Sequence, residues 1–194
     1  KLPYDYLELI ESTRGQRQLA VNPECSQGYT ASVSELISVK LIKAIKTHYG
    51  VSYAAVLNSV VIGAIQEILP RNKIPVPKFL TCEYVVPSPH ERPESVINQF
   101  HSLPVRWHML SNSAEERLYT TQEKINDLSS SAAPIALYWY QQLQSLLPAR
   151  LHGFMMSRED SGYVMTSSNF PVVDVHSNEH KLCDMFVGHN PTPG

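Results

Sequence analysis

The stretch Val164-Met165-Thr166-Ser167-Ser168-Asn169-Phe170-Pro171 carries the most information about the fold of this chain. An apolar run typical of a β-strand ends in two side chains that can hydrogen-bond to nearby backbone, and a proline then ends the strand ladder. The pattern predicts a rigid, polar-tipped corner at the end of a strand. Because many proteins have plain turns of this kind, its meaning depends on the elements that precede it.

A long apolar helix is predicted about a hundred residues upstream, from Tyr53 to Leu69. Ser52 is its expected N-cap, and Pro70 follows its end. The polar residues of this segment share one half of the helical wheel; they are Asn58, Ser59, Gly63 and Gln66. This stripe predicts either a polar neighbour or a close backbone contact at Gly63. Because a buried Asn must have partners, we expect Asn58 to be a structural bridge or part of a site wall, and we prefer the bridge.

Two strands are predicted between this helix and the corner. The segment Phe79 to Val86 alternates in the way of a strand, and Asn98 to Met109 does the same. One face of the second strand is expected to carry His101, Leu103, Val105, Trp107 and Met109. Pro104 interrupts this strand, which predicts that it is an edge strand or contains a bulge.

The remaining segments predict helices. One is expected from an N-cap at Ser34 to about Tyr49, with Gly50 ending it. Its apolar face would carry Ile37, Leu41 and Ile45, and the opposite face carries three lysines that we interpret as solvated: Lys40, Lys43 and Lys46.

Further helices are expected from a capping box at Ser113 to about Leu128, and from Pro134 to Leu147. The Tyr138-Trp139-Tyr140 cluster of the latter is expected in the core and at an interface. A short helix over 149–156 and a last strand around 181–187 complete the series. The order of elements predicts an α/β fold with a mixed sheet and flanking helices. The segments are too few for a TIM barrel, and no Gly-rich phosphate loop supports a Rossmann fold.

Composition limits the function classes. The chain has 194 residues, 43% of them hydrophobic and 18% charged, with a formal net charge of −2. That charge argues against a nucleic-acid partner, because no basic field is available to neutralise phosphates. The three cysteines, Cys25, Cys82 and Cys183, are odd in number and far apart, which favours reduced thiols over a disulfide framework. No apolar run reaches the roughly 18 uncharged residues of a membrane-spanning helix.

Catalytic and metal-binding signatures are sparse in this sequence. The spacing His176-x-x-x-His180-x-x-Cys183 is the only metal-like arrangement, and it lacks a fourth ligand at a credible distance, so we predict no metal site. The sequence has no Gly-x-Ser-x-Gly elbow and no cysteine with a nearby histidine in a known signature. We interpret His101 as a packed histidine rather than a base. No catalytic residue is therefore predicted in this chain.

Four local motifs, in this order, resemble the C-terminal half of the wax ester synthase/diacylglycerol acyltransferase family. Val56-Leu57-Asn58-Ser59-Val60-Val61 is similar to the family's Thr-Val-Asn-Asp-Val-Val helix start, and residues 80–92 to its valine- and proline-rich strand ending in Arg. Asn98-Gln99-Phe100 resembles its Gly-Asn-x-Phe strand. Ser168-Asn169-Phe170-Pro171 resembles its Ser-Asn-Val-Pro-Gly-Pro corner.

The resemblance implies a chloramphenicol acetyltransferase-like enzyme with two half-domains and a substrate tunnel between them. In that family a His-His-x-x-x-Asp motif in the N-terminal half supplies the base that activates the acceptor alcohol for attack on acyl-CoA. This chain has no His-His pair. Tunnel or structural roles would then fall to Asn58, Asn98, Ser168, Asn169 and Pro171. Acyl-CoA would be a substrate, with no cofactor, and a long-chain alcohol or diacylglycerol would be the acceptor.

The same resemblance implies how the chain is organised. Residues 1–27 would connect to a missing N-terminal half, and residues 28–194 would form the C-terminal half-domain, cut short at its end. That N-terminal half would be its main protein partner. The full-length protein would be membrane-associated and cytosol-facing, at the endoplasmic reticulum or plasma membrane, through segments outside this piece.

Two departures from the family pattern leave other functions open. Ser59 replaces the acidic residue beside Asn58, and Val172-Val173 replaces the Gly-Pro after Pro171. Both favour a catalytically silent relative that binds lipids or a partner. A third alternative is a condensation-type acyltransferase that uses carrier-protein thioesters.

Overall fold

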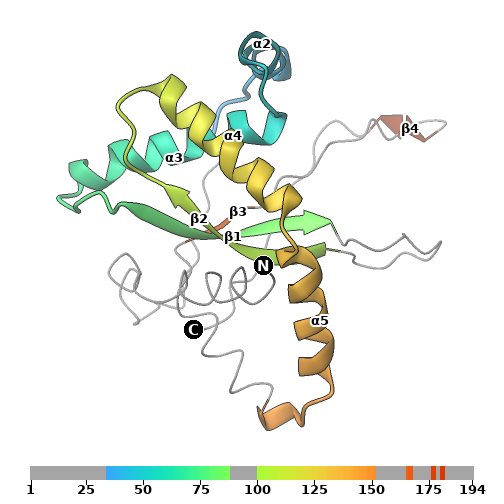
Figure 1. The fold of residues 1–194 in the computed structure, drawn as a ribbon. Helices are drawn as coiled ribbons and strands as arrows, with labels where there is room; N and C mark the ends of the chain where they lie inside the picture. The colour runs from blue at the N-terminus through green and yellow to red at the C-terminus, as the bar shows by residue number, and fades with distance from the viewer. Residues whose placement is uncertain (1–33, 88–99, 152–164, 168–175, 178–179, 182–194) are drawn as a thin grey trace.

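The computed structural model describes residues 34–87, 100–151, 165–167, 176–177 and 180–181. The predicted connector over 1–27 and most of the predicted helix over 149–156 and strand over 181–187 lie outside these residues. Within them, the fold is mixed α/β, as the order of elements predicted (Figure 1).

A three-stranded mixed sheet lies at the centre, in the order β2-β1-β3. Strand β1 spans Phe79–Pro87 and pairs antiparallel with β2, Phe100–His108, along its whole length. Strand β3, Met165–Ser167, pairs with the other side of β1 in parallel. The expectation that Pro104 marks an edge strand is confirmed, because β2 has a strand neighbour on one side only among the described residues.

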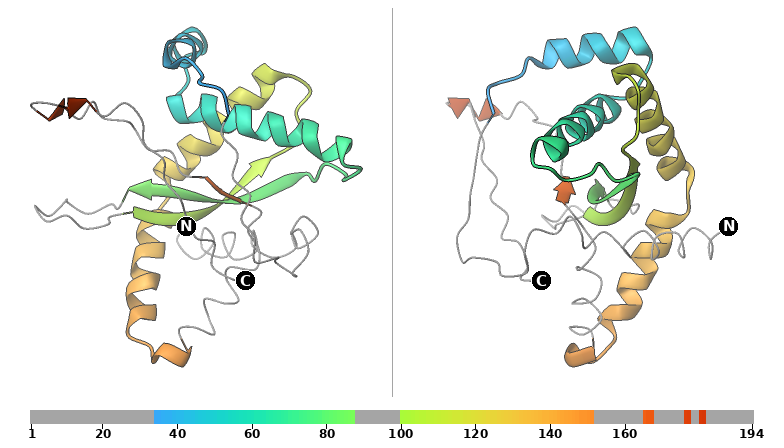
Figure 2. Two further views of the ribbon diagram at one scale, coloured as in Figure 1. Left: turned by 180° about the vertical axis from the view of Figure 1, so that it is seen from behind. Right: turned by 90° about the vertical axis from the view of Figure 1, so that its left-hand side faces the viewer.

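Two helices, α3 (Tyr53–Arg71) and α4 (Ala114–Ser130), cover one face of this sheet. A third, α2 (Val39–Tyr49), lies beyond them as an outer layer (Figures 1 and 2). From the end of α4, α5 (Ala133–Ser145) runs past the sheet toward its opposite side. A separate two-residue hairpin pairs β4 (His176–Ser177) with β5 (His180–Lys181).

The main core lies between the sheet and the helices. Alternate residues of β1 and β2 point into it, and the register places Leu80 opposite Trp107 and Cys82 opposite Val105. The buried members of this cluster are Ile62, Leu80, Cys82, Leu103, Val105, Trp107 and Met109. The predicted core face is confirmed at Leu80, Cys82, Leu103, Val105, Trp107 and Met109. Thr81, on the other face of β1, is also fully buried, and the side chain of His101 is not among those described. A second cluster joins α2, α3 and α4 around Val51, Ala55 and Leu118.

The helix ends follow the local sequence signals. Ser52 caps α3 by accepting from the Ala55 N–H at 3.1 Å, and Gly50 ends α2 with a φ of 65° that favours glycine. Ser113 caps α4 at 3.0 Å from the Glu116 N–H. The Glu116 carboxylate in turn accepts from the Asn112 N–H at 2.7 Å, which completes the predicted capping box one residue earlier than usual.

The predicted start of α2 is wrong by four residues. Its N-cap is Ser38, not Ser34, whose hydroxyl instead donates to the neighbouring Glu35 carbonyl. The predicted apolar face is also only partly right, because Ile42 is buried and Ile45 partly buried while Leu41 is exposed. The three lysines of α2 are exposed, as expected for a solvated face.

Two further differences concern α3 and α5. Helix α3 continues through Pro70 to Arg71, because a proline in the last turn still allows Asn72 to close the helix with its backbone N–H. By length and composition α3 could cross a membrane, but it packs on the sheet and α4 as a core helix does.

On α5, Trp139 is 59% exposed, so it is not part of the core of the described residues, and its interface role stays a prediction.

Candidate functional site

Four of the five residues with predicted tunnel or structural roles stand, in the sequence, close to the ends of described strands. Asn98, Ser168, Asn169 and Pro171 themselves fall outside the described residues. Strand β2 begins at Phe100, opposite Pro87, and β3 ends at Ser167, opposite Tyr84. Both positions lie toward the carboxyl end of β1. The chain therefore enters β2 from the Asn98-Gln99 motif, and leaves β3 into Ser168-Asn169, at the same end of the sheet.

A side-chain hydrogen bond holds the short strand β3 in this register. Thr166 donates from its hydroxyl to the Glu83 carboxylate at 2.7 Å, and these two residues are also direct partners in the parallel pairing. A hydrogen bond to an ionised carboxylate is stronger than a neutral one. The bond thus fixes the position of the residue two places before Ser168 relative to β1.

Asn58 is buried on α3, as the sequence predicted for the edge of the polar stripe. Its amide Nδ2 donates to the Ala54 carbonyl at 2.8 Å, one turn earlier in the same helix. This bond satisfies the buried amide locally, so it does not itself join α3 to another element. The preferred role as a bridge therefore gains no support from it.

The polar stripe of α3 faces an arginine of α4. Arg117 donates from Nε to the Ser59 carbonyl at 3.0 Å and from Nη1 to the Gln66 side chain at 3.2 Å. Between these two bonds the guanidinium lies so close to Gly63 that a Cβ there would be 2.7 Å from Nη2. The first alternative is therefore confirmed, because the stripe faces a polar neighbour; the close contact at Gly63 is with the side chain of Arg117 and not with another backbone.

Two more polar contacts extend this seam between the helices. The Ser52 backbone N–H donates to the Gln122 side chain at 2.6 Å, which anchors the start of α3 on α4. The Tyr49 hydroxyl donates to the Glu115 carboxylate at 3.1 Å. This hydrogen bond to Glu115 is the main reason that the pKa of Tyr49 is raised above 10.0. Together with Arg117, these contacts fix how α2 and α3 lie on α4.

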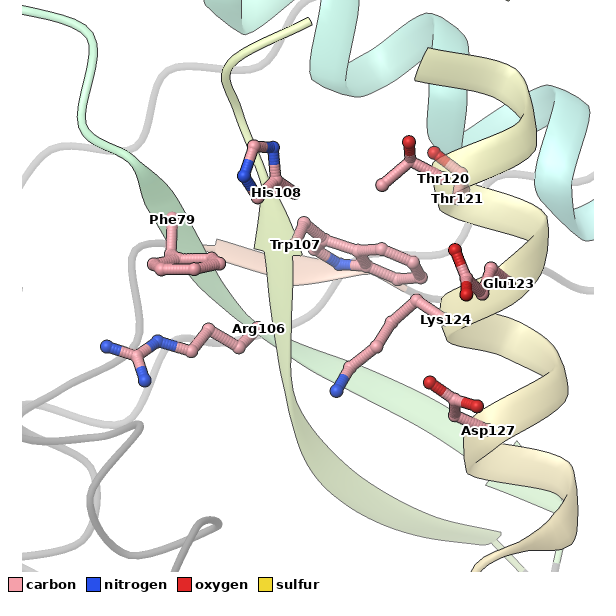
Figure 3. A pocket seen from close by; sticks show the side chains of 9 residues that line it. All are labelled: Phe79, Arg106, Trp107, His108, Thr120, Thr121, Glu123, Lys124 and Asp127. Atoms are coloured by element: carbon pink, nitrogen blue, oxygen red, sulfur yellow. The ribbon is translucent and has the colours of Figure 1, made fainter. Parts of the chain in front are cut away.

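A pocket of about 220 Å³ opens between β2 and α4 (Figure 3). It is lined by Phe79, Arg106, Trp107, His108, Thr120, Thr121, Glu123, Lys124 and Asp127. Figure 3 shows Trp107 pointing toward α4, whereas Arg106 points away from α4 on the side of Phe79. The lining mixes two cations with two carboxylates, so the pocket has no strong preference for ligand charge.

Aromatic contacts hold one wall of the pocket. The Arg106 guanidinium lies 4.7 Å from the centre of the Phe79 ring, and Lys78 lies over the same ring at 5.2 Å. The His108 ring meets Phe79 edge-on at 5.2 Å. Arg106 Nε is buried without a hydrogen-bond partner among the described residues. No sequence pattern indicated this pocket, because strand alternation predicts the two faces of a sheet but not a gap between a strand and a neighbouring helix.

Two candidate nucleophiles in the described part of the chain, Cys82 and Thr121, are not activated. Burial raises the pKa of the Cys82 thiol from 9.0 to about 12, so the thiol stays protonated at neutral pH. The Thr121 hydroxyl in the pocket donates to the Arg117 carbonyl at 2.7 Å, a bond within its own helix. Neither residue stands beside a general base that could take its proton. Elsewhere, across β3 and β1, the Thr166 hydroxyl does donate to a carboxylate, that of Glu83.

Metal-binding groups are likewise missing from the described ranges, where no cluster of three or more His, Cys, Asp or Glu could hold an ion. The backbone of the hairpin β4–β5 places His176 opposite Lys181 and Ser177 opposite His180. Cys183, the third member of the metal-like spacing, lies outside the described residues.

Arg117 is the residue of structural importance that sequence reasoning missed. The polar stripe on α3 predicted a polar partner, but the spacing of its residues did not identify which side chain that partner would be.

Comparisons with models of protein families, with curated proteins and with solved structures gave no match.

Proposed function

We propose that this chain is the C-terminal part of an acyl-CoA-dependent O-acyltransferase that makes wax esters or triacylglycerol. The acceptor would be a long-chain alcohol or diacylglycerol, and the fold would be one half of a chloramphenicol acetyltransferase-like enzyme. The observation that supports the proposal is that β2 begins at Phe100 and β3 ends at Ser167 toward the same end of β1. In the sequence these strand ends adjoin the two motifs, Asn98-Gln99-Phe100 and Ser168-Asn169-Phe170-Pro171. These segments lie 70 positions apart in the sequence.

The chemistry of the described residues supports a role as a partner half rather than a complete enzyme. The reaction needs a base to take the proton of the acceptor hydroxyl as it attacks the thioester carbonyl. In the described part of the chain, neither Cys82 nor Thr121 stands beside such a base. The proposed enzyme would obtain it from the N-terminal half, and this half would shape and close the tunnel.

A catalytically silent, lipid-binding relative is the second candidate, and Ser59 favours it. This residue occupies the position of the family's acidic residue, and it is buried in the seam between α3 and α4. Arg117 there bonds the Ser59 backbone carbonyl, so the seam is complete without a carboxylate. Loss of the acidic group is therefore compatible with the fold.

The deciding experiment is acyl transfer by the full-length protein, with labelled palmitoyl-CoA and either hexadecanol or diacylglycerol. We expect labelled ester from the full-length protein and none from the 194-residue chain alone. Ester formation by the isolated chain would overturn the assignment, since the base is expected elsewhere. Binding of acyl-CoA without transfer by the full-length protein would select the silent relative.

A matched pair of variants tests the corner itself. Asn169→Ala should lower full-length activity at least about tenfold, because it would leave hydrogen-bonding groups of the corner unpaired at a cost of roughly 1–3 kcal/mol. Asn178→Ala, in the neighbouring polar segment, should change activity little. Equal and small effects from both substitutions would show that Ser168-Asn169 is an ordinary turn.

A further inference from the structure

Helix α2 is the outermost layer of the described structure. In both views of Figure 2 it lies on the side of α3 and α4 that faces away from the sheet. Its inner side packs through Ile42, Ile45 and Tyr49 onto the second core cluster. Its other sides carry exposed residues. This leaves one long face of α2, together with the segment that leads into it, open to a partner.

The charge on this open face is positive. Lys40, Lys43 and Lys46 are all exposed, and the helix itself contains no acidic residue. Glu35, in the lead-in, is the nearest acidic residue before it, and Glu115 of α4 is engaged with Tyr49 on the inner side. The surface therefore has three lysines against one free carboxylate, although the whole chain is slightly acidic. A local basic face on an acidic protein favours an anionic partner.

Large apolar side chains stand beside these lysines. Leu36 is 99% exposed, and Ile37 is 61% exposed, in the extended residues before the helix. Val39 and Leu41 are exposed at its start. Moving the Leu36 side chain from water into an apolar environment is favourable. A phosphate ligand in water would offer this side chain no apolar contact. The combination of a basic crest and protruding aliphatic residues matches a partner that is both anionic and apolar.

We propose that residues 36–46 form a contact site for an anionic lipid bilayer. The lysine ammonium groups would lie among acidic head groups, with their aliphatic stems along the surface, while Leu36 and Ile37 enter the acyl boundary. Neither signal alone gives firm attachment, but an apolar insertion and a basic patch together do. This site does not depend on the proposed acyl transfer, because vesicle binding is measured without any reaction.

Flotation of the full-length protein with vesicles tests the charge term. Phosphatidylcholine vesicles with phosphatidylserine should bind the protein more strongly than vesicles without it, and high salt should weaken this binding. The triple variant Lys40→Glu/Lys43→Glu/Lys46→Glu should lower the partition coefficient between about tenfold and a hundredfold. Lys73→Glu, an exposed lysine in the connection after α3, is the matched control and should have little effect. Unchanged binding of the triple variant would overturn the proposal.

A local probe tests insertion even where another segment also anchors the protein. An environment-sensitive dye would be attached at Leu36→Cys or, as the control, at Ile68→Cys on the exposed side of α3. Cys25 and Cys183 would first be replaced by serine, while the buried Cys82 is left in place. We expect a blue shift on phosphatidylserine vesicles at position 36 and none at position 68. No shift at position 36, or equal shifts at both, would overturn the proposal.

Discussion

The contact between Gly63 and Arg117 predicts a substitution whose effect changes sign with its background. A glycine inside a helix costs about 1 kcal/mol relative to alanine, so Gly63→Ala would stabilise an isolated α3 by that amount. In this structure the added Cβ would lie 2.7 to 2.9 Å from three guanidinium atoms of Arg117. Such a separation forces the guanidinium to move away.

Moving Arg117 breaks its bonds to the Ser59 carbonyl and to Gln66. Hydrogen bonds from charged groups contribute about 1.5–3 kcal/mol when buried, and we take about 1 kcal/mol for each of these half-exposed ones. The loss of about 2 kcal/mol exceeds the gain in helix propensity. Gly63→Ala should therefore lower the free energy of unfolding by about 1 kcal/mol.

In an Arg117→Met background the same change should raise stability by about 1 kcal/mol, because the methionine stem keeps the packing and removes the guanidinium. Urea unfolding of the four proteins, followed by circular dichroism, gives the coupling energy directly. Ala64→Gly is the control, since Ala64 is exposed on α3 and should cost the same in both backgrounds. Stabilisation by Gly63→Ala in both backgrounds would refute the packing of Arg117 over Gly63.

Two further stability predictions follow from the structure. Burial raises the pKa of the Cys82 thiol from 9.0 in the unfolded chain to about 12 in the folded protein. The favourable contribution of the neutral, buried thiol to folding is therefore complete below pH 9.0. It is lost as the pH rises toward 12, because the thiol of the unfolded chain ionises first. Between pH 8 and pH 10 the native protein should thus lose roughly 1 kcal/mol that Cys82→Ala does not lose, as compared by urea midpoints. Ser113→Ala removes the cap of α4 and should cost about 1 kcal/mol, whereas Ser129→Ala on the exposed side should change the melting temperature little.

The sequence predicted best where a local signal also has a local cause. Ser52, Gly50 and Ser113 end or begin helices through bonds to residues a few positions away, and the structure confirms each of them. Alternation predicted the buried faces of β1 and β2 because the core lies on one side of them. Pro104 indicated an edge strand because proline lacks the backbone N–H that a central strand donates to its neighbours.

The predictions that were wrong or missing depend on distant neighbours. Ser34 is of a residue type that often caps helices, but residues 35–37 have nothing to pack against. A helix over these residues would bury no side chain, and α2 therefore begins later. Trp139 has the character of a core residue, yet α5 extends past the sheet and leaves it exposed. Arg117 and the pocket beside β2 arise from the packing of α4, which no periodicity in the sequence specifies.

The brevity of β3 has a consequence for the order in which the sheet forms. It contributes three residues to the pairing with β1, and its bond from Thr166 to Glu83 joins positions 83 apart. Closing so long a loop for so few contacts is slow and gives little stability of its own. We therefore expect β3 to join a sheet that β1 and β2 have already formed, and its amide protons to exchange with solvent earlier than theirs. A ligand or a second half-domain that gripped the corner after Ser167 would slow that exchange, and so would report its own binding through this strand.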